Sequence, residues 1–204
     1  MTVQAAQPRL VLASASASRQ VLLLAAGLRF SAMPAAVDEA AIKQAARAAG
    51  HAAGETALRL AAAKAARVAA REPAALVIGC DQLLICGDAW FDKPADLGEA
   101  ARHLRALSGR SHRLATATVA WRGGRQVWQN LAWPELTMRS LSDDFIAGYL
   151  ALEGTAVLSS VGAYRLEGPG VQLFSHIEGE HSAILGLPLL PLLGFLRDEG
   201  VLPS

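Results

Sequence analysis

Two short apolar runs, residues 10–13 and 75–78, constrain the fold of this 204-residue chain more than any other feature. Each is a continuous hydrophobic stretch too short for a helix, which is typical of a strand buried on both faces. A stretch of helical character over residues 17–26 follows the first run, and an alanine-rich zone over residues 40–71 precedes the second. Strands that alternate with helices predict an α/β fold in which flanking helices cover a mixed, twisted sheet.

Local signals place the remaining elements. Capping residues or proline open three further predicted helices, each ending at a glycine, over about residues 96–109, 142–154 and 188–200. Alternating apolar and polar residues on both sides of Gly123-Gly124 predict a β-hairpin. Since no linker or change of composition divides the chain, we expect one domain over residues 1–204, with residues 1–9 as a short N-terminal tail.

The alanine-rich zone divides into two faces in its second half. One face carries alanine, leucine and valine, and we expect it to be buried. The other carries Leu60, Lys64, Arg67 and Arg71, and we expect it to face solvent as a mostly basic stripe.

Composition limits the classes of partner. The chain has 19 Lys plus Arg and 18 Asp plus Glu. Proteins held on nucleic acid or anionic membranes by charge usually have a basic excess, so we expect neither as a partner. A small polyanion needs only a few well-placed cations and stays possible.

Other sequence features concern the compartment. Residues 1–9 lack the apolar stretch that a signal peptide requires. The most apolar segment, residues 183–196, is interrupted by two prolines and is too short to span a membrane. Cys80 and Cys86 fit neither a disulfide framework nor CxxC metal spacing, which favours buried free thiols. We therefore expect a cytoplasmic protein.

Asp81 stands out among the polar residues because it follows a buried apolar strand and Gly79. A carboxylate there is costly if it is merely buried, and ligands of open α/β sheets bind at the carboxyl ends of strands. Position alone leaves two interpretations equally open, a functional carboxylate and a loop aspartate that caps a turn.

A serine-rich turn, residues 14–19, joins the first predicted strand to its helix. Helix-start N–H groups, serine hydroxyls and the Arg19 guanidinium suit phosphate oxygens. Simple capping, with Arg19 in solvent, explains the same residues and is favoured when the turn is taken alone.

Other charged residues have equally plain explanations. Asp38 and Glu39 could join a third carboxylate in holding Mg²⁺, but an exposed acidic turn is the commoner outcome. Lys64 alone is expected on a solvated helix face, and Lys93 in a loop.

The run from His176 to His181 suggests zinc, but its spacing is not HExxH, and we favour a strand followed by a turn. The chain also lacks the GxxxxGK[ST] and GxSxG patterns, which disfavours a P-loop NTPase and the commonest hydrolase triad.

Nine short segments in order resemble the Maf family of nucleotide pyrophosphatases over nearly the whole chain. They are LVLASASASRQVLL (10–23), VDE (37–39), RLAAAKA (59–65), VIGCDQ (77–82), KP (93–94), LSG (107–109), VGAYRLEG (161–168), IEG (177–179) and LGLPL (185–189). The resemblance implies an inosine triphosphate pyrophosphatase-like fold of the Maf type, with two lobes around a cleft. It also implies a homodimer.

The activity implied by this resemblance is Mg²⁺-dependent hydrolysis of a nucleoside triphosphate to the monophosphate and pyrophosphate. Asp81 is then the general base that activates water, and Glu39 helps Asp81 to place the metal. The residues implied in binding the substrate phosphates are Ser16, Arg19, Lys64 and Lys93, with Glu39 beside them.

Base specificity follows from two further positions. Gln82 and Glu167 resemble the branch of the family that acts on 7-methyl-GTP, whereas the branch acting on dTTP and UTP carries Thr and Gln there. The methyl-guanine branch usually has Trp where this chain has Ser18, and Pro where it has Ala17. We therefore predict 7-methyl-GTP or another modified nucleotide as the substrate. The alternatives are a dTTP/UTP pyrophosphatase, and a nucleotide-binding regulator of septum formation and cell division that has lost turnover.

Overall fold

The computed structural model describes residues 4–203. Its strands follow the order β2-β1-β3-β5-β7-β8, with β4 paired to β3 and β6 paired to β5. β1 (Leu10–Leu12) is parallel to β2 (Ser31–Ala32) and to β3 (Leu76–Cys86). The pairing of β5 (Ser111–Arg122) with β6 (Arg125–Ala132) is antiparallel, as are those of β3 with β4, of β5 with β7 and of β7 with β8. The predicted mixed sheet of an α/β fold is therefore confirmed.

The chain divides into two compact units. The first unit comprises residues up to Asp81, 116–132 and 180 onward, and the second unit comprises residues 82–115 and 133–179. Two units agree with the two lobes expected from the family resemblance. A cleft between lobes, and a single domain over the whole chain, stay predictions.

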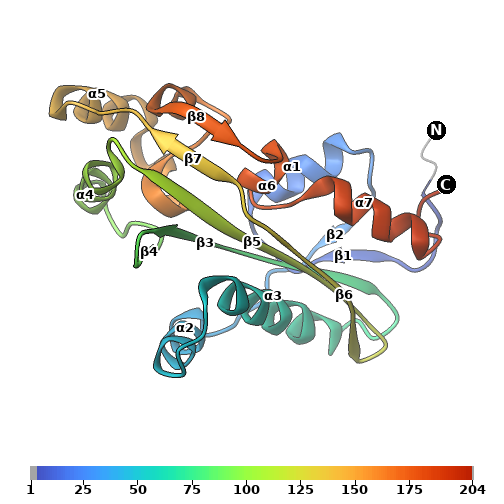
Figure 1. Ribbon diagram of the computed structural model, residues 1–204. Helices are drawn as coiled ribbons and strands as arrows, with labels where there is room; N and C mark the ends of the chain where they lie inside the picture. The colour runs from blue at the N-terminus through green and yellow to red at the C-terminus, as the bar shows by residue number, and fades with distance from the viewer. Residues whose placement is uncertain (1–3, 204) are drawn as a thin grey trace. The chain divides into compact units, whose positions relative to one another are not determined.

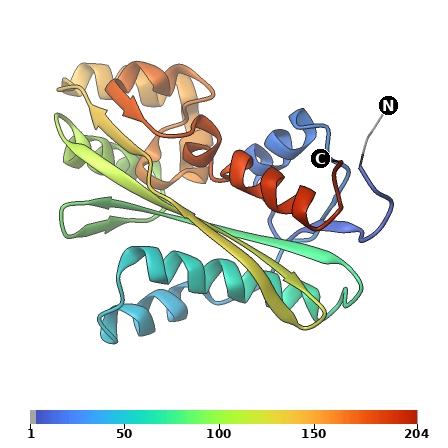
Figure 2. The same ribbon diagram turned by 45° about the vertical axis from the view of Figure 1, so that its right-hand side comes forward.

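The first unit carries helices on both faces of its strands. Helices α1 (Ala17–Ala25) and α7 (Leu189–Asp198) lie on one face of β1 and β3, and α3 (Ala53–Ala69) lies on the other (Figure 1, Figure 2). Helix α2 (Glu39–Ala48) packs against α3. The short helix α6 (His181–Ile184) precedes α7.

Alternate residues of β3 face these two helical layers. Leu76, Ile78 and Cys80 join the apolar core that includes Leu23 of α1 and Phe195 of α7. The intervening residues face α3, because successive side chains of a strand point to opposite faces. The predicted buried thiols are also confirmed, since both cysteines are free and buried.

Gly79 brings β3 and α3 close together. A Cβ at this position would lie 2.2 Å from the Ala61 carbonyl oxygen and 2.8 Å from the Ala65 Cβ. The absence of a side chain on the strand and the small alanines on the helix therefore permit a close backbone approach.

The outward basic stripe predicted for α3 was partly wrong. Leu60 is completely buried, and the Lys64 side chain is only 12% exposed, whereas Arg67 and Arg71 do face solvent. Helix α3 packs against both α2 and the sheet, so its buried surface is wider than the single apolar stripe that periodicity predicted.

The second unit contains the elements β4 (Ala89–Phe91), α4 (Leu97–Leu107), β7 (Glu135–Met138), α5 (Asp143–Glu153) and β8 (Phe174–Glu178). Three 3₁₀ turns, Gly154–Ser159, Val161–Ala163 and Pro169–Leu173, connect α5 to β8 (Figure 1).

The predicted helix starts and the hairpin are confirmed. The Asp96 side chain accepts from the Glu99 N–H at 2.7 Å, and Ser142 accepts from Phe145 N–H at 3.1 Å. Gly123-Gly124 connects β5 to β6, and α7 follows Pro188 directly.

Residues 1–3 of the predicted N-terminal tail lie outside the described residues. Gln4 and Ala5 are held by hydrogen bonds, since Ala5 N–H donates to the Val201 carbonyl at 2.8 Å and Gln4 exchanges bonds with Arg29. None of the helices within residues 4–203 combines the length and the apolar character needed to span a bilayer.

Candidate active site

Asp81 lies within β3, and β3 continues beyond it to Cys86. The expectation that Asp81 follows the end of a strand was therefore wrong, and so was its alternative, a loop aspartate that caps a turn. Its side chain is 6% exposed and projects from the same face of β3 as Gly79, toward α3. A carboxylate so deeply buried is retained only where other groups compensate for its desolvation.

Lys64 of α3 supplies the nearest compensating charge. Its Nζ lies 2.6 Å from Asp81 Oδ1 and 2.8 Å from Glu39 Oε1, so one ammonium bridges two carboxylates. Glu39 is the first residue of α2, whose N-terminus is capped by the Asp38 side chain accepting from Ala41 N–H at 2.9 Å. The structure thus brings together three of the predicted site residues.

The second carboxylate oxygen of Asp81 is in a different situation. Oδ2 is buried and makes no hydrogen bond with any residue of 4–203. Burial raises the pKa of Asp81 above its usual value, an effect that the Lys64 ammonium and the Arg19 guanidinium reduce and that Glu39 increases. A carboxylate with a raised pKa and an oxygen without a partner is suited to accept a proton or a further ligand.

Arg19 is fixed by three acceptors. Its Nε donates to the Gly186 carbonyl at 2.8 Å, and its Nη1 donates to the Cys80 carbonyl at 3.1 Å and to Ser14 Oγ at 3.2 Å. The alternative in which Arg19 is free in solvent was therefore wrong. Because Cys80 immediately precedes Asp81, these bonds place the guanidinium beside the catalytic candidate.

The serine-rich turn serves as the start of α1. Ser16 is the N-cap and accepts from the Arg19 N–H at 3.4 Å, while Ser14 Oγ accepts from the Ser16 N–H at 3.2 Å. Capping by Ser16 is therefore confirmed, and phosphate binding by Ser16 stays a prediction. Ser18 follows in the first turn of α1 and is half-buried.

The residues present fit a divalent cation. Glu39 and Asp81 offer hard oxygen ligands, and Asp81 Oδ2 is already desolvated without a partner in the described chain. Among residues 4–203, however, no group of three or more His, Cys, Asp and Glu side chains could hold a metal alone. Two carboxylates are enough for Mg²⁺ when substrate phosphates and water complete its shell.

The remaining predicted site residues belong to the second unit. Gln82 follows Asp81 on β3 and therefore projects from the opposite face of the strand. Lys93 follows β4 and is exposed. Glu167 lies in the turn before Pro169–Leu173, with its Oε1 3.7 Å from Arg165 Nε. Their roles toward a ligand stay predictions.

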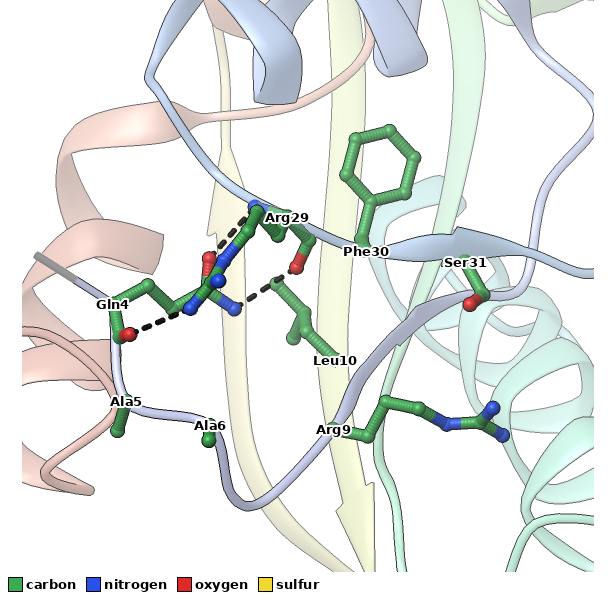
Figure 3. A pocket seen from close by; sticks show the side chains of 8 residues that line it. All are labelled: Gln4, Ala5, Ala6, Arg9, Leu10, Arg29, Phe30 and Ser31. Carbon is green, nitrogen blue, oxygen red and sulfur yellow. Dashed lines mark hydrogen bonds between the residues drawn. The ribbon is translucent and has the colours of Figure 1, made fainter. Parts of the chain in front are cut away.

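Two hollows are lined by residues other than those of the Asp81 cluster. One, of about 290 Å³, is lined by Arg9, Phe30 and Ser31, with Gln4 and Arg29 joined by hydrogen bonds at its side (Figure 3). The other, of about 440 Å³, is in the second unit. None of the predicted site residues lines either hollow.

Sequence reasoning missed the backbone groups of the site. The carbonyls of Cys80 and Gly186 hold Arg19, and no side-chain pattern identifies an acceptor carbonyl. The sequence did contain one signal, the glycine at 186 in LGLPL (185–189); in the structure its φ is +99°, and a Cβ there would lie 3.1 Å from Arg19 Nε. A glycine is therefore needed at 186 both for the backbone conformation and for the approach of Arg19.

The fold and the site together define an α/β protein with a buried carboxylate flanked by a lysine and an arginine, a class of site suited to an anionic ligand. The chain belongs to the family described as Maf-like protein, whose sequence model matches residues 9–199.

Three relatives match almost the whole chain. It is 53% identical over 194 residues to the nucleoside triphosphate pyrophosphatase of Granulibacter bethesdensis, a match covering 95% of this chain and 98% of the relative. It is 52% identical over 195 residues to the 7-methyl-GTP pyrophosphatase of Rhizobium etli, covering 96% and 98%. The 7-methyl-GTP pyrophosphatase of Mesorhizobium japonicum is 49% identical over 194 residues, covering 95% and 98%.

Proposed function

We propose that this protein hydrolyses nucleoside triphosphates to the monophosphate and pyrophosphate. The observation that carries the proposal is Asp81, a buried carboxylate with one oxygen paired to Lys64 and the other without a hydrogen-bond partner in residues 4–203. The names of the relatives agree with this activity.

In the proposed reaction Asp81 accepts a proton from the attacking water. The water oxygen bonds to the α phosphorus, and the bond from this phosphorus to the α–β bridging oxygen breaks. Pyrophosphate leaves with the bridging oxygen. A general base within reach of the water accelerates such a step by about 10²–10⁴-fold.

Lys64 and Arg19 are the phosphate ligands of the first unit in this proposal. Arg19 is held by three acceptors, so little side-chain entropy remains to be lost when it binds phosphate oxygens. Lys64 has two carboxylate partners and can give one of its N–H donors to a phosphate oxygen while keeping another bond. Ser16 and Lys93 are proposed as further phosphate ligands.

Glu39 and Asp81 are the proposed ligands of a divalent metal, and we propose Mg²⁺. Bound there, the metal would neutralise part of the triphosphate charge. The rest of the chemistry assigned above belongs to side chains of this chain.

For the substrate we propose 7-methyl-GTP or another modified nucleotide, with Gln82 and Glu167 as the residues that distinguish the base. Two of the relatives described above carry 7-methyl-GTP in their names, which favours this choice over dTTP and UTP. Ser18 stands where an aromatic residue is expected, so Ser18→Trp should sharpen the preference for methylated guanine.

A panel of canonical and modified triphosphates, incubated with the protein and Mg²⁺, tests both levels of the proposal. Pyrophosphate release that disappears in Asp81→Asn supports the enzyme, whereas release no greater than the Asp81→Asn background from every nucleotide contradicts it and favours the nucleotide-binding regulator. Faster release from UTP or dTTP than from 7-methyl-GTP contradicts the roles of Gln82 and Glu167.

We also propose a cytoplasmic homodimer that binds neither nucleic acid nor membrane. The free, buried Cys80 and Cys86 agree with a reducing compartment. Light scattering coupled to gel filtration would measure the mass, and a mass of about 21 kDa, that of one chain, would contradict the dimer.

A further inference from the structure

Glu180, a carboxylate that no step above uses, binds the start of helix α7. Its Oε1 accepts from the N–H groups of Leu189 at 2.9 Å and Leu190 at 3.0 Å, and also from the Ser182 hydroxyl. Ser182 Oγ in turn accepts from Leu189 N–H at 3.0 Å. Pro188, the N-cap residue of α7, offers no side-chain acceptor. Glu180 therefore satisfies donors that a helix N-terminus would otherwise leave unpaired.

These bonds close the segment between Glu180 and α7 into a loop. Inside it, Leu187 N–H donates to the Ser182 carbonyl at 2.9 Å and Gly186 N–H donates to the Ala183 carbonyl at 3.1 Å. The loop is further attached to β5, because the buried Thr116 hydroxyl donates to the Ala183 carbonyl at 3.0 Å. The position of Gly186 is thus set by contacts at both ends of the loop.

The Gly186 carbonyl of this loop is the acceptor for Arg19 Nε, at 2.8 Å. We propose that Glu180 is a positioning residue for Arg19: by tying the loop to the start of α7, it holds the Gly186 carbonyl where it orients the guanidinium. The importance of that orientation for substrate binding rests on the proposed function, in which Arg19 binds phosphate.

Loss of the Glu180 carboxylate has a defined consequence in this scheme. The Leu190 N–H then turns to water, and the Leu189 N–H keeps only Ser182 Oγ, which itself loses the acceptor of its hydroxyl proton. The closure of the loop is therefore weakened. Arg19 keeps its Nη1 bonds to Cys80 and Ser14 but loses the fixed partner of Nε. Because the guanidinium is a planar fork, losing one of its anchors lets the whole group rotate.

Hydrogen exchange of the Arg19 Nε–H measures this link directly. Its ¹H–¹⁵N signal can be assigned by its absence from Arg19→Lys. Glu180→Ala should accelerate the exchange at least tenfold, and Glu180→Gln, which retains an oxygen acceptor, should stay close to wild type. Ser142→Ala is the matched control, because it removes the cap of α5 and leaves the loop intact. An unchanged exchange rate in Glu180→Ala would overturn the proposal.

A second variant keeps the measurement decisive if Glu180→Ala does not fold. Glu180→Asp shortens the side chain by one methylene and should also accelerate the exchange. Wild-type exchange in a folded Glu180→Asp would then count against the positioning role.

Kinetics then connect Glu180 to the substrate. Glu180→Ala should raise KM for the triphosphate about as much as Arg19→Ala does, and should add little further in the double variant, because residues that act through one contact are not additive. Additive effects on KM would mean that Glu180 stabilises the fold without acting through Arg19. If the wild type hydrolyses no nucleotide, the proposed function fails, and the exchange measurement still decides the role of Glu180.

Discussion

Two carboxylates of this protein are buried to the same degree, yet their surroundings differ. Asp81 in the first unit and Glu153 in the second are each 6% exposed, and each is paired with one cation, Lys64 or Arg165. Burial next to a single cation is therefore not what distinguishes a candidate catalytic group from a structural one.

The Glu153 cluster consists of groups whose partners are fixed. Arg165 Nη1 donates to Glu153 at 3.0 Å, and the Arg165 backbone N–H donates to the Tyr149 hydroxyl at 3.3 Å. Burial raises the pKa of Tyr149 to about 12, so the phenol stays neutral. Gly168 and Gly170 let the turn close tightly, since a Cβ at either would lie within 3.0 Å of Glu153 or Arg165.

The Asp81 cluster contains groups that can change partners. Lys64 is shared with Glu39, which is 46% exposed, and Asp81 Oδ2 has no hydrogen-bond partner within the described chain. A satisfied network rigidifies a fold, whereas a partly satisfied one has a capacity for a ligand. Arg165 is also shared between two carboxylates, Glu153 and Glu167, so the comparison leaves the unsatisfied oxygen of Asp81 as the mark of function.

The largest expected effect comes from neutralising each carboxylate in turn. Asp81→Asn should lower kcat by about 10³-fold, because it removes the general base. Glu153→Gln should lower the melting temperature and leave kcat unchanged. Steady-state rates of pyrophosphate release and thermal melts measure the two effects. Equal losses of kcat in both variants would remove the distinction between the clusters.

Acid should weaken the second unit through His112. Its Nε2 is 2.9 Å from the Tyr164 hydroxyl, and burial lowers its pKa to about 4, below the ordinary value of 6.5. The unfolded chain therefore takes up the proton first as pH falls. Above pH 6.5 His112 is neutral in both the folded and the unfolded chain, and its titration costs no stability. As pH falls from 6.5 toward 4, the free energy of unfolding decreases by up to about 3 kcal/mol.

Urea unfolding between pH 7 and pH 4, comparing wild type with His112→Phe, isolates that contribution. The difference in unfolding free energy should change over this window in the stated direction. A difference that is constant with pH would show that His112 titrates alike in the folded and unfolded chains.

A methyl group added to one glycine in each unit tests the packing behind the two clusters. Gly79→Ala should cost about 1–3 kcal/mol, because its Cβ would lie 2.2 Å from the Ala61 carbonyl oxygen. It should also lower kcat, since α3 must shift and carries Lys64 with it. Gly162→Ala, whose Cβ would lie 2.4 Å from Leu84 Cδ1 at a φ of +76°, should cost at least as much stability and leave kcat unchanged. Undiminished kcat in Gly79→Ala would show that the position of Lys64 is not set by this contact.

The smallest effect concerns the pH dependence of turnover. Because burial raises the pKa of Asp81, the acidic limb of the kcat profile should lie above pH 3.8, the ordinary value for Asp. Lys64→Met removes the largest lowering influence and should move the limb to higher pH, whereas Arg67→Met on the exposed side of α3 should not. If the acidic limb moves equally in both variants, its position depends on the overall charge of the protein and not on the contact between Lys64 and Asp81.

The sequence predicted the fold well because its local signals agree with the tertiary structure. Capping side chains at Asp96 and Ser142, the double glycine at 123–124 and the apolar runs all lie where predicted. The error on α3 has a physical cause: a helix packed on two sides buries residues such as Leu60 that a one-face pattern assigns to solvent.

The site was predictable at the level of residue types and less so in its contacts. Spacing gave no reason to join Lys64 with Asp81, since the pair depends on the close approach of β3 and α3 at Gly79. The anchors of Arg19 include two backbone carbonyls, which a sequence does not distinguish from any others. The family resemblance named Lys64, Asp81 and Arg19 as site residues without supplying these contacts, and their roles stay predictions.

The alternation along β3 has a consequence for how this protein tolerates changes in length. A one-residue insertion or deletion between residues 76 and 81 would rotate every following side chain to the other face of the strand. A one-residue deletion would move the Asp81 carboxylate to the position of Cys80 in the apolar core, and a one-residue insertion would put the thiol of Cys80 beside Lys64. Loops elsewhere can lengthen at little cost in free energy, but residues 76–81 tolerate substitutions only and no change in the number of residues.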